Sequence, residues 1–153
     1  MTQQNEKWAT ERIIPSQADD AIALITEMVD RLRQREWEEQ DLFGIHLALE
    51  EAIMNAIKHG NEGDPTKQVD VRCELSSEHF EITVEDQGSG FKRSDVPDPT
   101  DEDNLEKESG RGLMLMEFYM SEVHYNEMGN RVRMVKNRGE EPAMSGGDQG
   151  DED

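Results

Sequence analysis

Apolar residues recur every three or four positions between Ile45 and Ile57, which is the spacing of one helical face. This spacing predicts a long helix in the middle of the chain, opened by acidic residues around Asp41 that suit a helix N-terminus. We expect the helix to end at Gly60, because glycine readily adopts the left-handed C-cap conformation, and Asn61 follows it.

Polar residues border the apolar stripe of this central helix. Glu51 and Asn55 are four residues apart, so a helix places both on one face, about 6 Å apart along its axis. Lys58 and His59 follow one turn later. A carboxylate and an amide at the rim of a core helix can face a site, but this spacing alone is more typical of a solvated helix edge.

Shorter patterns on either side of the central helix predict one domain of the α/β or α+β class. Alternating apolar and polar residues indicate strands, and a segment with helical spacing begins at Ser16, a residue type that can cap it. The expected elements are a strand over 8–14 closed by Pro15, a helix over 16–35, a hairpin of strands 69–75 and 80–84, a helix over 113–120, and strands at 123–125 and 132–134.

Two segments that contain glycines carry candidate chemistry. The first, DQGSGF at 86–91, directly follows a predicted strand; Asp86 can accept a hydrogen bond from a ligand amino group, and the glycines let the backbone approach a flat ring. The second, SGRG at 109–112, opens an apolar helix, where free backbone N–H groups favour a phosphate and Arg111 adds a charge-assisted contact. Each segment alone is more typical of an ordinary turn. Their order along the chain is the stronger signal.

The two glycine segments enclose an acidic stretch, and a second acidic stretch ends the chain. Residues 92–109 contain seven acids and two prolines, and loops of this length are usually lids, binding loops or disordered segments. Residues 139–153 hold six acids and no Lys or Arg, so we predict a disordered acidic tail after a folded domain over 1–138.

The charge of the chain limits its partners. The net charge is −20, and without the six acids of the tail the body still carries −14, which argues against a broad nucleic-acid-binding face. Such a charge also repels free polyanions at long range. Salt screens this repulsion beyond about 8–10 Å, so a metal ion and a few local cations can still hold a triphosphate.

Cysteine and hydropathy patterns favour a cytoplasmic protein without a membrane partner. The single cysteine, Cys73, excludes an internal disulfide and lies at an apolar strand position, which predicts a buried thiol. The four histidines lack the spacing of a metal site. The sequence has no apolar run long enough to cross a bilayer and no apolar signal region at its N-terminus.

The order of these segments resembles the GHKL ATPase superfamily. EEAIMNAIKHGN resembles its N box, DQGSGF its first glycine box and GRGLMLM its second, over about residues 8–137. By length the chain is most similar to the bacterial anti-sigma-factor serine/threonine kinases of stress response and sporulation. The resemblance implies an α/β two-layer sandwich (the Bergerat fold): a mixed, mostly antiparallel sheet of about five strands with three helices on one face, and ATP between the helices and a lid over 92–109.

The resemblance also implies roles for individual residues. Glu51 would be the general base and Asn55 a ligand of Mg²⁺, while Asp86 would bind the adenine amino group. Further members of the implied ATP site are Lys58 and His59, Gly88 and Gly90 at the adenine, Gly110, Arg111 and Gly112 at the phosphates, and Leu113. One position departs from the family: Asn130 stands where members often carry threonine, which weakens the claim for a phosphate or base contact there.

The function implied is an ATP-dependent protein serine/threonine kinase that binds a sigma factor and phosphorylates a small antagonist protein. Members of the family commonly dimerise, so the resemblance also implies a homodimer. The alternative is an ATP-binding switch that sequesters a partner without phosphoryl transfer; the presence of Glu51 favours the kinase, because a pure binder needs no base. A histidine-kinase catalytic domain would need an upstream acceptor histidine, and the predicted first helix contains none. The fourth hypothesis is a domain that binds no nucleotide and carries these motifs by accident.

Overall fold

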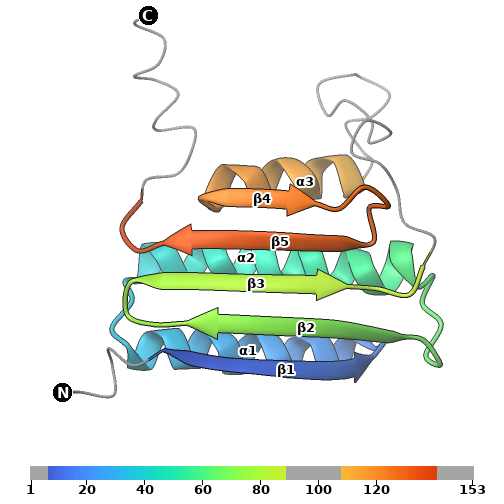
Figure 1. Cartoon of the computed structure of the whole chain (residues 1–153), viewed down its shortest axis with the longest axis horizontal. Helices are drawn as coiled ribbons and strands as arrows, with labels where there is room; N and C mark the ends of the chain where they lie inside the picture. The colour runs from blue at the N-terminus through green and yellow to red at the C-terminus, as the bar shows by residue number, and fades with distance from the viewer. Residues whose placement is uncertain (1–6, 89–107, 141–153) are drawn as a thin grey trace, which may run out of the picture.

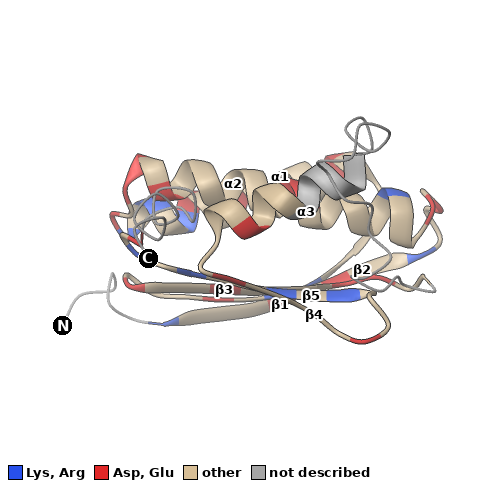
Figure 2. Ribbon diagram, turned by 90° about the horizontal axis from the view of Figure 1, so that it is seen from above, with Lys and Arg blue, Asp and Glu red and all other residues tan. Residues whose placement is uncertain are grey.

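A sheet forms one layer of the molecule, and helices form the other (Figures 1 and 2). The computed structural model describes residues 7–88 and 108–140. In chain order their elements are β1 (Trp8–Pro15), α1 (Ala18–Gln34), α2 (Glu39–Asn55), the π-helical turn η2 (Ala56–Gly60), β2 (Gln68–Leu75), β3 (His79–Glu85), α3 (Glu108–Tyr119), β4 (Glu122–Tyr125) and β5 (Arg131–Asn137).

The strand order is β1-β2-β3-β5-β4, and every pair of neighbouring strands is antiparallel. The predicted two-layer sandwich with helices on one face is confirmed, whereas the mixed character of the sheet is not found among the described strands. The reason lies in the topology. β3 and β4 run in the same direction, but β5 lies between them and pairs antiparallel with both (Figure 1).

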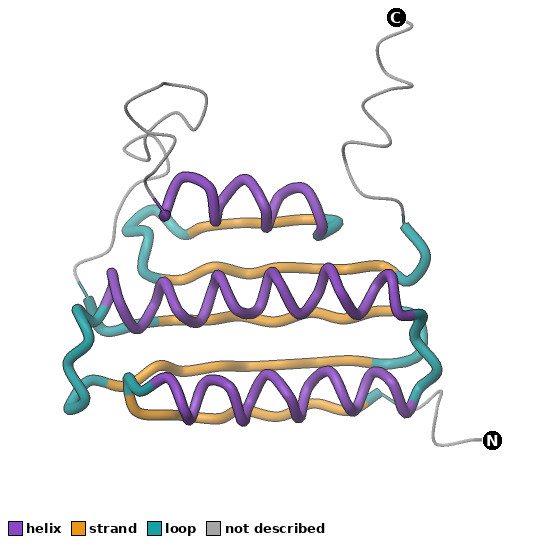
Figure 3. The backbone as a smooth tube through the Cα atoms, turned by 180° about the vertical axis from the view of Figure 1, so that it is seen from behind, coloured by secondary structure: helices purple, strands orange, loops and turns teal. Residues whose placement is uncertain are grey.

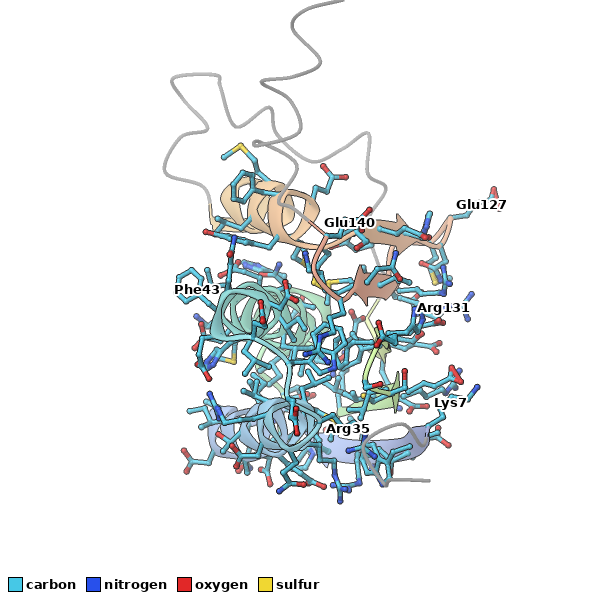
Figure 4. All side chains as sticks on the ribbon, turned by 90° about the vertical axis from the view of Figure 1, so that its left-hand side faces the viewer. Lys7, Arg35, Phe43, Glu127, Arg131 and Glu140 are labelled. Atoms are coloured by element: carbon cyan, nitrogen blue, oxygen red, sulfur yellow. The ribbon has the colours of Figure 1, made fainter. Side chains whose placement is uncertain are left out.

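The two faces of the sheet differ sharply, as the alternating sequence pattern predicts. Val69 and Val71 of β2 point toward the helices and are buried, whereas the residues that alternate with them along the strand, such as Asp70 and Arg72, face outward. The outward face carries ion pairs between strands, such as Arg133 Nε with Glu81 at 2.7 Å. Figure 4 shows Lys7 and Arg131 on this outer side, opposite the helix layer that carries Phe43.

Helix α2 is the middle helix of its layer and lies between α1 and α3 (Figure 3). Its predicted apolar stripe is confirmed: the buried members are Ile45, Ala48, Leu49, Ala52, Ile53, Ala56 and Ile57. These side chains belong to the hydrophobic core between the helices and the sheet, where α2 lies over β3 and β5 (Figures 1 and 3). No helix in residues 7–88 or 108–140 has the length and apolar character that a membrane span requires.

The end of the central helix differs from the prediction. The α-helix stops at Asn55 and continues as one π-helical turn, in which the Asn61 N–H donates to the Ala56 carbonyl at 2.8 Å. Gly60 does not have the positive φ of a left-handed C-cap; that conformation occurs at Glu62 (φ 55°) and Gly63 (φ 70°). The wider turn delays the chain reversal by two residues, and such turns are frequent at functional sites.

The starts of helices α1 and α3 also differ from the prediction. Gln17 is the N-cap of α1 and makes no side-chain capping bond, whereas the Ser16 hydroxyl donates to the Lys67 carbonyl at 2.8 Å and so fastens the β1–α1 corner to β2. Helix α3 begins at Glu108, slightly before the glycines at which the sequence pattern places its start. The predicted phosphate segment therefore lies within its first two turns.

The end of the sandwich at the left of Figure 1 is closed by a buried charged pair. Lys136 is 3% exposed; its Nζ donates to the Glu140 carbonyl at 2.6 Å and lies 3.9 Å from Asp41 Oδ1. The other Asp41 oxygen accepts from the Gly139 N–H at 2.9 Å. Gly139 and Glu140 thus contact the folded part, while the domain boundary at 138 and the acidic tail stay predictions. Residues 141–153 lie outside the described residues.

Lys136→Met is expected to lower the free energy of unfolding by about 1–3 kcal/mol, because it leaves a buried carboxylate and a carbonyl without their cation. Lys7→Met is the matched control, since Lys7 pairs with Glu74 at the surface, where water screens the charges and an ion pair contributes little to stability. Urea unfolding of both variants measures the difference. Equal losses would show that the Lys136 cluster contributes no more than a surface pair.

The Cys73 thiol is buried, as predicted from its strand position. Burial raises its pKa to about 12, so the thiol stays protonated at neutral pH. Because the thiolate is the reactive form, Cys73 is a packing residue and not a nucleophile.

Candidate active site

Four pieces of the chain meet at the end of the sandwich opposite the Lys136 cluster, at the right of Figure 1. They are the C-terminal end of α2 with η2, the end of β3, the start of α3, and the β4–β5 turn. The segments that the sequence singled out as an N box and two glycine boxes thus lie at the same end of the molecule. The β1–α1 corner, with Ser16, lies there too.

Glu51 and Asn55 occupy the last turns of α2. Both side chains are partly exposed, and the α-helical geometry between them keeps them on one face, as expected from their spacing. Asn55 is the last α-helical residue before the π turn. Lys58 and His59, within that turn, are exposed.

Asp86 is held from both sides at the end of β3. Its N–H donates to the Asn130 carbonyl at 2.9 Å, and its own carbonyl accepts from the Asn130 side-chain amide at 3.2 Å. Its Oδ1 accepts from the Gly88 N–H at 2.8 Å, which closes a tight turn. Asn130 therefore acts on the main chain of Asp86, a role that sequence comparison with threonine did not suggest.

The Asp86 residue is 9% exposed, and burial raises the pKa of its carboxyl above the ordinary value of 3.8. The hydrogen bond from the Gly88 N–H opposes this rise, the neighbouring charge of Glu85 adds to it, and Lys67 lowers it. Among the residues that the structure describes, the carboxyl has one hydrogen-bond partner, the Gly88 N–H, which donates to Oδ1.

Two glycines allow the end of α2 to pack directly on the Asp86 turn. A Cβ at Gly88 would lie 1.8 Å from the Gly60 carbonyl oxygen, and a Cβ at Gly60 would lie 2.3 Å from the Asp86 carboxyl. A side chain at position 88 would require a backbone shift, and one at position 60 would displace the Asp86 carboxyl. This contact connects the helix of Glu51 and Asn55 to the loop of Asp86.

Several predicted site residues cannot be placed in the same detail. Gly90 and nearly all of the predicted lid lie outside the described residues. The backbone of Gly110, Arg111, Gly112 and Leu113 belongs to the first turns of α3, and their side chains are not described. Their predicted roles at the phosphates stay predictions.

The sequence reading missed three residues that build the site: Gly60 as a packing position, Asn61 and Asn130. Asn61 is fully buried, and its side chain bonds to three separate segments. The available signal was a polar residue directly after an apolar helix, which is also typical of an exposed turn. Among the described residues, no three His, Cys, Asp or Glu side chains converge as metal ligands.

Comparison with known families matches residues 14–136 to the histidine kinase-like ATPase domain. The chain belongs to this family. The match spans every element from the end of β1 to β5, including the helix of Glu51 and Asn55 and the loop of Asp86. Membership in a family of ATPase domains implies that ATP is bound.

Curated relatives carry two kinds of name. The chain is 34% identical over 102 residues to an anti-sigma F factor of Oceanobacillus iheyensis, a match that covers 63% of this chain and 69% of the relative. It is 34% identical over 103 residues to a serine-protein kinase RsbW of Bacillus licheniformis, covering 63% of this chain and 64% of that relative. The match thus spans just under two thirds of the kinase.

The fold has a solved counterpart in the RsbU and RsbW domains of Rv1364c from Mycobacterium tuberculosis. The TM-score is 0.58 and the sequence identity 16%; the match covers 86% of this chain and 32% of the larger one. At this identity the likeness establishes the fold alone. It supports the two-layer arrangement of the chain.

Proposed function

We propose that this chain is an ATP-dependent protein serine/threonine kinase and an anti-sigma factor, which holds a sigma factor in the cytoplasm and phosphorylates a small antagonist protein. The names of its relatives supply both halves of this proposal. The observation that carries it is the contact of Gly60 with Asp86 and Gly88, because it joins a helix bearing a carboxylate to a loop able to recognise a base. A homodimer stays a prediction of the resemblance.

Asp86 would recognise the adenine. A carboxylate accepts hydrogen bonds only, which suits an exocyclic amino group, and no residue in the described parts of the chain donates to its Oδ2. Gly88, and by resemblance Gly90, would leave room for the flat ring. ATP and ADP share this part, so both should bind.

The phosphates and Mg²⁺ would lie between η2 and the start of α3. Mg²⁺ is a hard ion that prefers oxygen ligands, and the amide oxygen of Asn55 is one. Because the described residues offer no cluster of three acidic or histidine ligands, phosphate oxygens and water would have to complete the coordination, which is usual for nucleotide-bound Mg²⁺. Lys58 and His59 are exposed beside Asn55, and the positive charge of Lys58 would offset the acidic body there.

The first turn of α3 would contribute to the phosphate site. Unpaired backbone N–H groups at a helix N-terminus, with the helix dipole, favour an anion. Gly110 and Gly112 would let a phosphate approach closely, and Arg111 and Leu113 belong to the same turns.

Glu51 would act as the general base. It lies one helical turn before Asn55, so a base and a metal ligand would stand side by side. The serine hydroxyl oxygen of the antagonist would attack the γ-phosphorus, its proton would pass to the Glu51 carboxylate, and ADP would leave. A positioned base contributes about 10²–10⁴-fold to such a step.

The proposal is tested in two measurements on the whole chain. Calorimetry with Mg²⁺ present should detect both ATP and ADP, and a chain that binds neither would contradict the nucleotide site. Phosphate incorporation from labelled ATP into the cognate antagonist, with sigma-factor binding measured in parallel, tests the kinase. If the chain binds ATP and a sigma factor but transfers no phosphate to an antagonist that it binds, it is an ATP-dependent switch.

Gly88→Ala is expected to weaken ADP binding tenfold or more, because the new Cβ would displace either the Asp86 turn or the end of η2. Gly63→Ala is a matched control: its φ of 70° adds about 1–2 kcal/mol of backbone strain, yet no atom lies within 4 Å of the new Cβ. It should reduce stability and leave ADP affinity unchanged. Calorimetry measures the ADP affinity of both variants, and thermal unfolding measures their stability. Equal ADP affinities would show that the Gly60–Gly88 contact has no role in nucleotide binding.

A further inference from the structure

One buried side chain joins the Asp86 loop to the rest of the fold. The Asn61 side-chain amide donates to Ser16 Oγ at 2.8 Å and to the Gln68 carbonyl at 3.0 Å, and its oxygen accepts from the Gln87 N–H at 2.8 Å. The residue is 0% exposed. It thus connects the β1–α1 corner, the start of β2 and the residue directly after Asp86.

The three partners fix the orientation of this amide. The Gln87 N–H can only donate and the Gln68 carbonyl can only accept, so the oxygen must face the first and the nitrogen the second. Aspartate at this position would set an oxygen against a carbonyl, and an apolar residue would satisfy neither partner. Asparagine has the length and the pair of groups that this buried position requires.

Further bonds stiffen the same corner. The Gln87 side-chain oxygen accepts from the Gln68 N–H at 2.7 Å, and the Ser16 hydroxyl donates onward to the Lys67 carbonyl. On the other side of Asp86, Asn130 holds its N–H and carbonyl. The peptide that carries the Asp86 carboxyl is therefore fixed before and after the side chain, with Asn61 as its link to the helix layer.

We propose that Asn61 is the positioning residue that sets the recognition of a 6-aminopurine by Asp86. It makes no contact with a ligand itself; it fixes the Gln87 peptide and with it the direction of the Asp86 carboxylate. This inference rests on the proposed nucleotide site. A carboxylate held in one direction discriminates an amino group from its absence, whereas a mobile one does so weakly.

The test compares ADP with purine riboside 5′-diphosphate, which lacks only the 6-amino group. Wild type should prefer ADP by about tenfold, the usual scale for one hydrogen bond to a charged group. In Asn61→Ala this preference should shrink to about twofold or less. Exchange of the Gln87 amide hydrogen in the ligand-free protein should accelerate in the same variant.

Ser16→Ala is the matched control. It removes one partner of the Asn61 amide and part of the corner, but keeps the bond to Gln87, so it should destabilise the fold while preserving the preference for ADP. If Asn61→Ala does not fold, Asn61→Ser, which is too short to reach Gln87, takes its place. If the Ser16 and Asn61 variants lose the preference for ADP equally, the role of Asn61 is structural only.

The two levels of the proposal fail separately. A wild-type chain that binds neither diphosphate contradicts the nucleotide site as a whole. A wild-type chain that prefers ADP, together with an Asn61 variant that keeps this preference and a slow Gln87 exchange, contradicts only the role of Asn61.

Discussion

Glu51→Gln is expected to leave ATP affinity near that of wild type while phosphoryl transfer to the antagonist falls by about 10²–10⁴-fold. Glutamine keeps the shape of the side chain and most of its polar contacts but cannot accept the proton of the attacking hydroxyl. The measurement is phosphate incorporation into the antagonist beside nucleotide affinity. Sigma-factor binding should survive, because it needs the nucleotide-bound fold and not the transfer step.

Glu50→Gln is the control for this change. It makes the same substitution one residue earlier, on a different face of α2, where the carboxylate is 49% exposed and lies 3.7 Å from His46. Its transfer rate should match wild type. A Glu51→Gln variant that phosphorylates as fast as wild type would show that Glu51 is not the base, even if the chain is a kinase.

A variant of Asn55 distinguishes the proposed role in metal binding from the proposed role of Glu51 as the base. An Asn55→Ala variant lacks the proposed Mg²⁺ ligand, so ATP affinity in the presence of Mg²⁺ should fall together with turnover, unlike the Glu51 variant. The two residues lie on the same helical face, so a general disturbance of α2 would affect both properties in both variants. The contrast between them is what supports distinct roles.

The local patterns of the sequence predicted most of the elements. The apolar spacing from Ile45 to Ile57 is set by burial against the sheet, and burial follows directly from residue type, so the central helix could be found. The hairpin of β2 and β3 could be found for the same reason. The antiparallel order of all strands could not, because the position of β5 between β3 and β4 depends on contacts far apart in the sequence.

The errors arose where a residue acts through the tertiary structure. Gly60 was interpreted as a local cap, but what it needs is space for the Asp86 carboxyl, 26 residues later. Asn61 bonds to Ser16, 45 residues earlier, and no sequence period reports such a link. Helix α3 begins at Glu108, slightly before the glycines where the sequence predicted its start, because a helix boundary in a polar segment is only weakly marked by residue type.

Asp86→Asn is expected to weaken ATP and ADP alike, by about tenfold, because both share the adenine and because a charged acceptor forms the stronger hydrogen bond. The ligand-free variant should be more stable than wild type at neutral pH. The pKa of Asp86 is raised in the folded state, mainly by burial, so folding favours the protonated carboxyl. The contribution of Asp86 to wild-type stability must then fall as pH rises from the ordinary value of 3.8 through the raised value, whereas asparagine does not ionise.

The gain in stability of Asp86→Asn should therefore be present at pH 7 and vanish below pH 3.8, where both side chains are neutral. Thermal unfolding of the two proteins across this range measures it. Glu85→Gln is the control: it removes the neighbouring charge that adds to the rise, keeps the Asp86 carboxylate and should leave ADP affinity close to wild type. Weaker ADP binding together with higher stability would show that Asp86 serves ligand recognition and lowers the stability of the ligand-free fold. If Asp86→Asn instead loses stability at neutral pH, the role of Asp86 is to close the turn with the Gly88 N–H, and other residues must recognise the adenine.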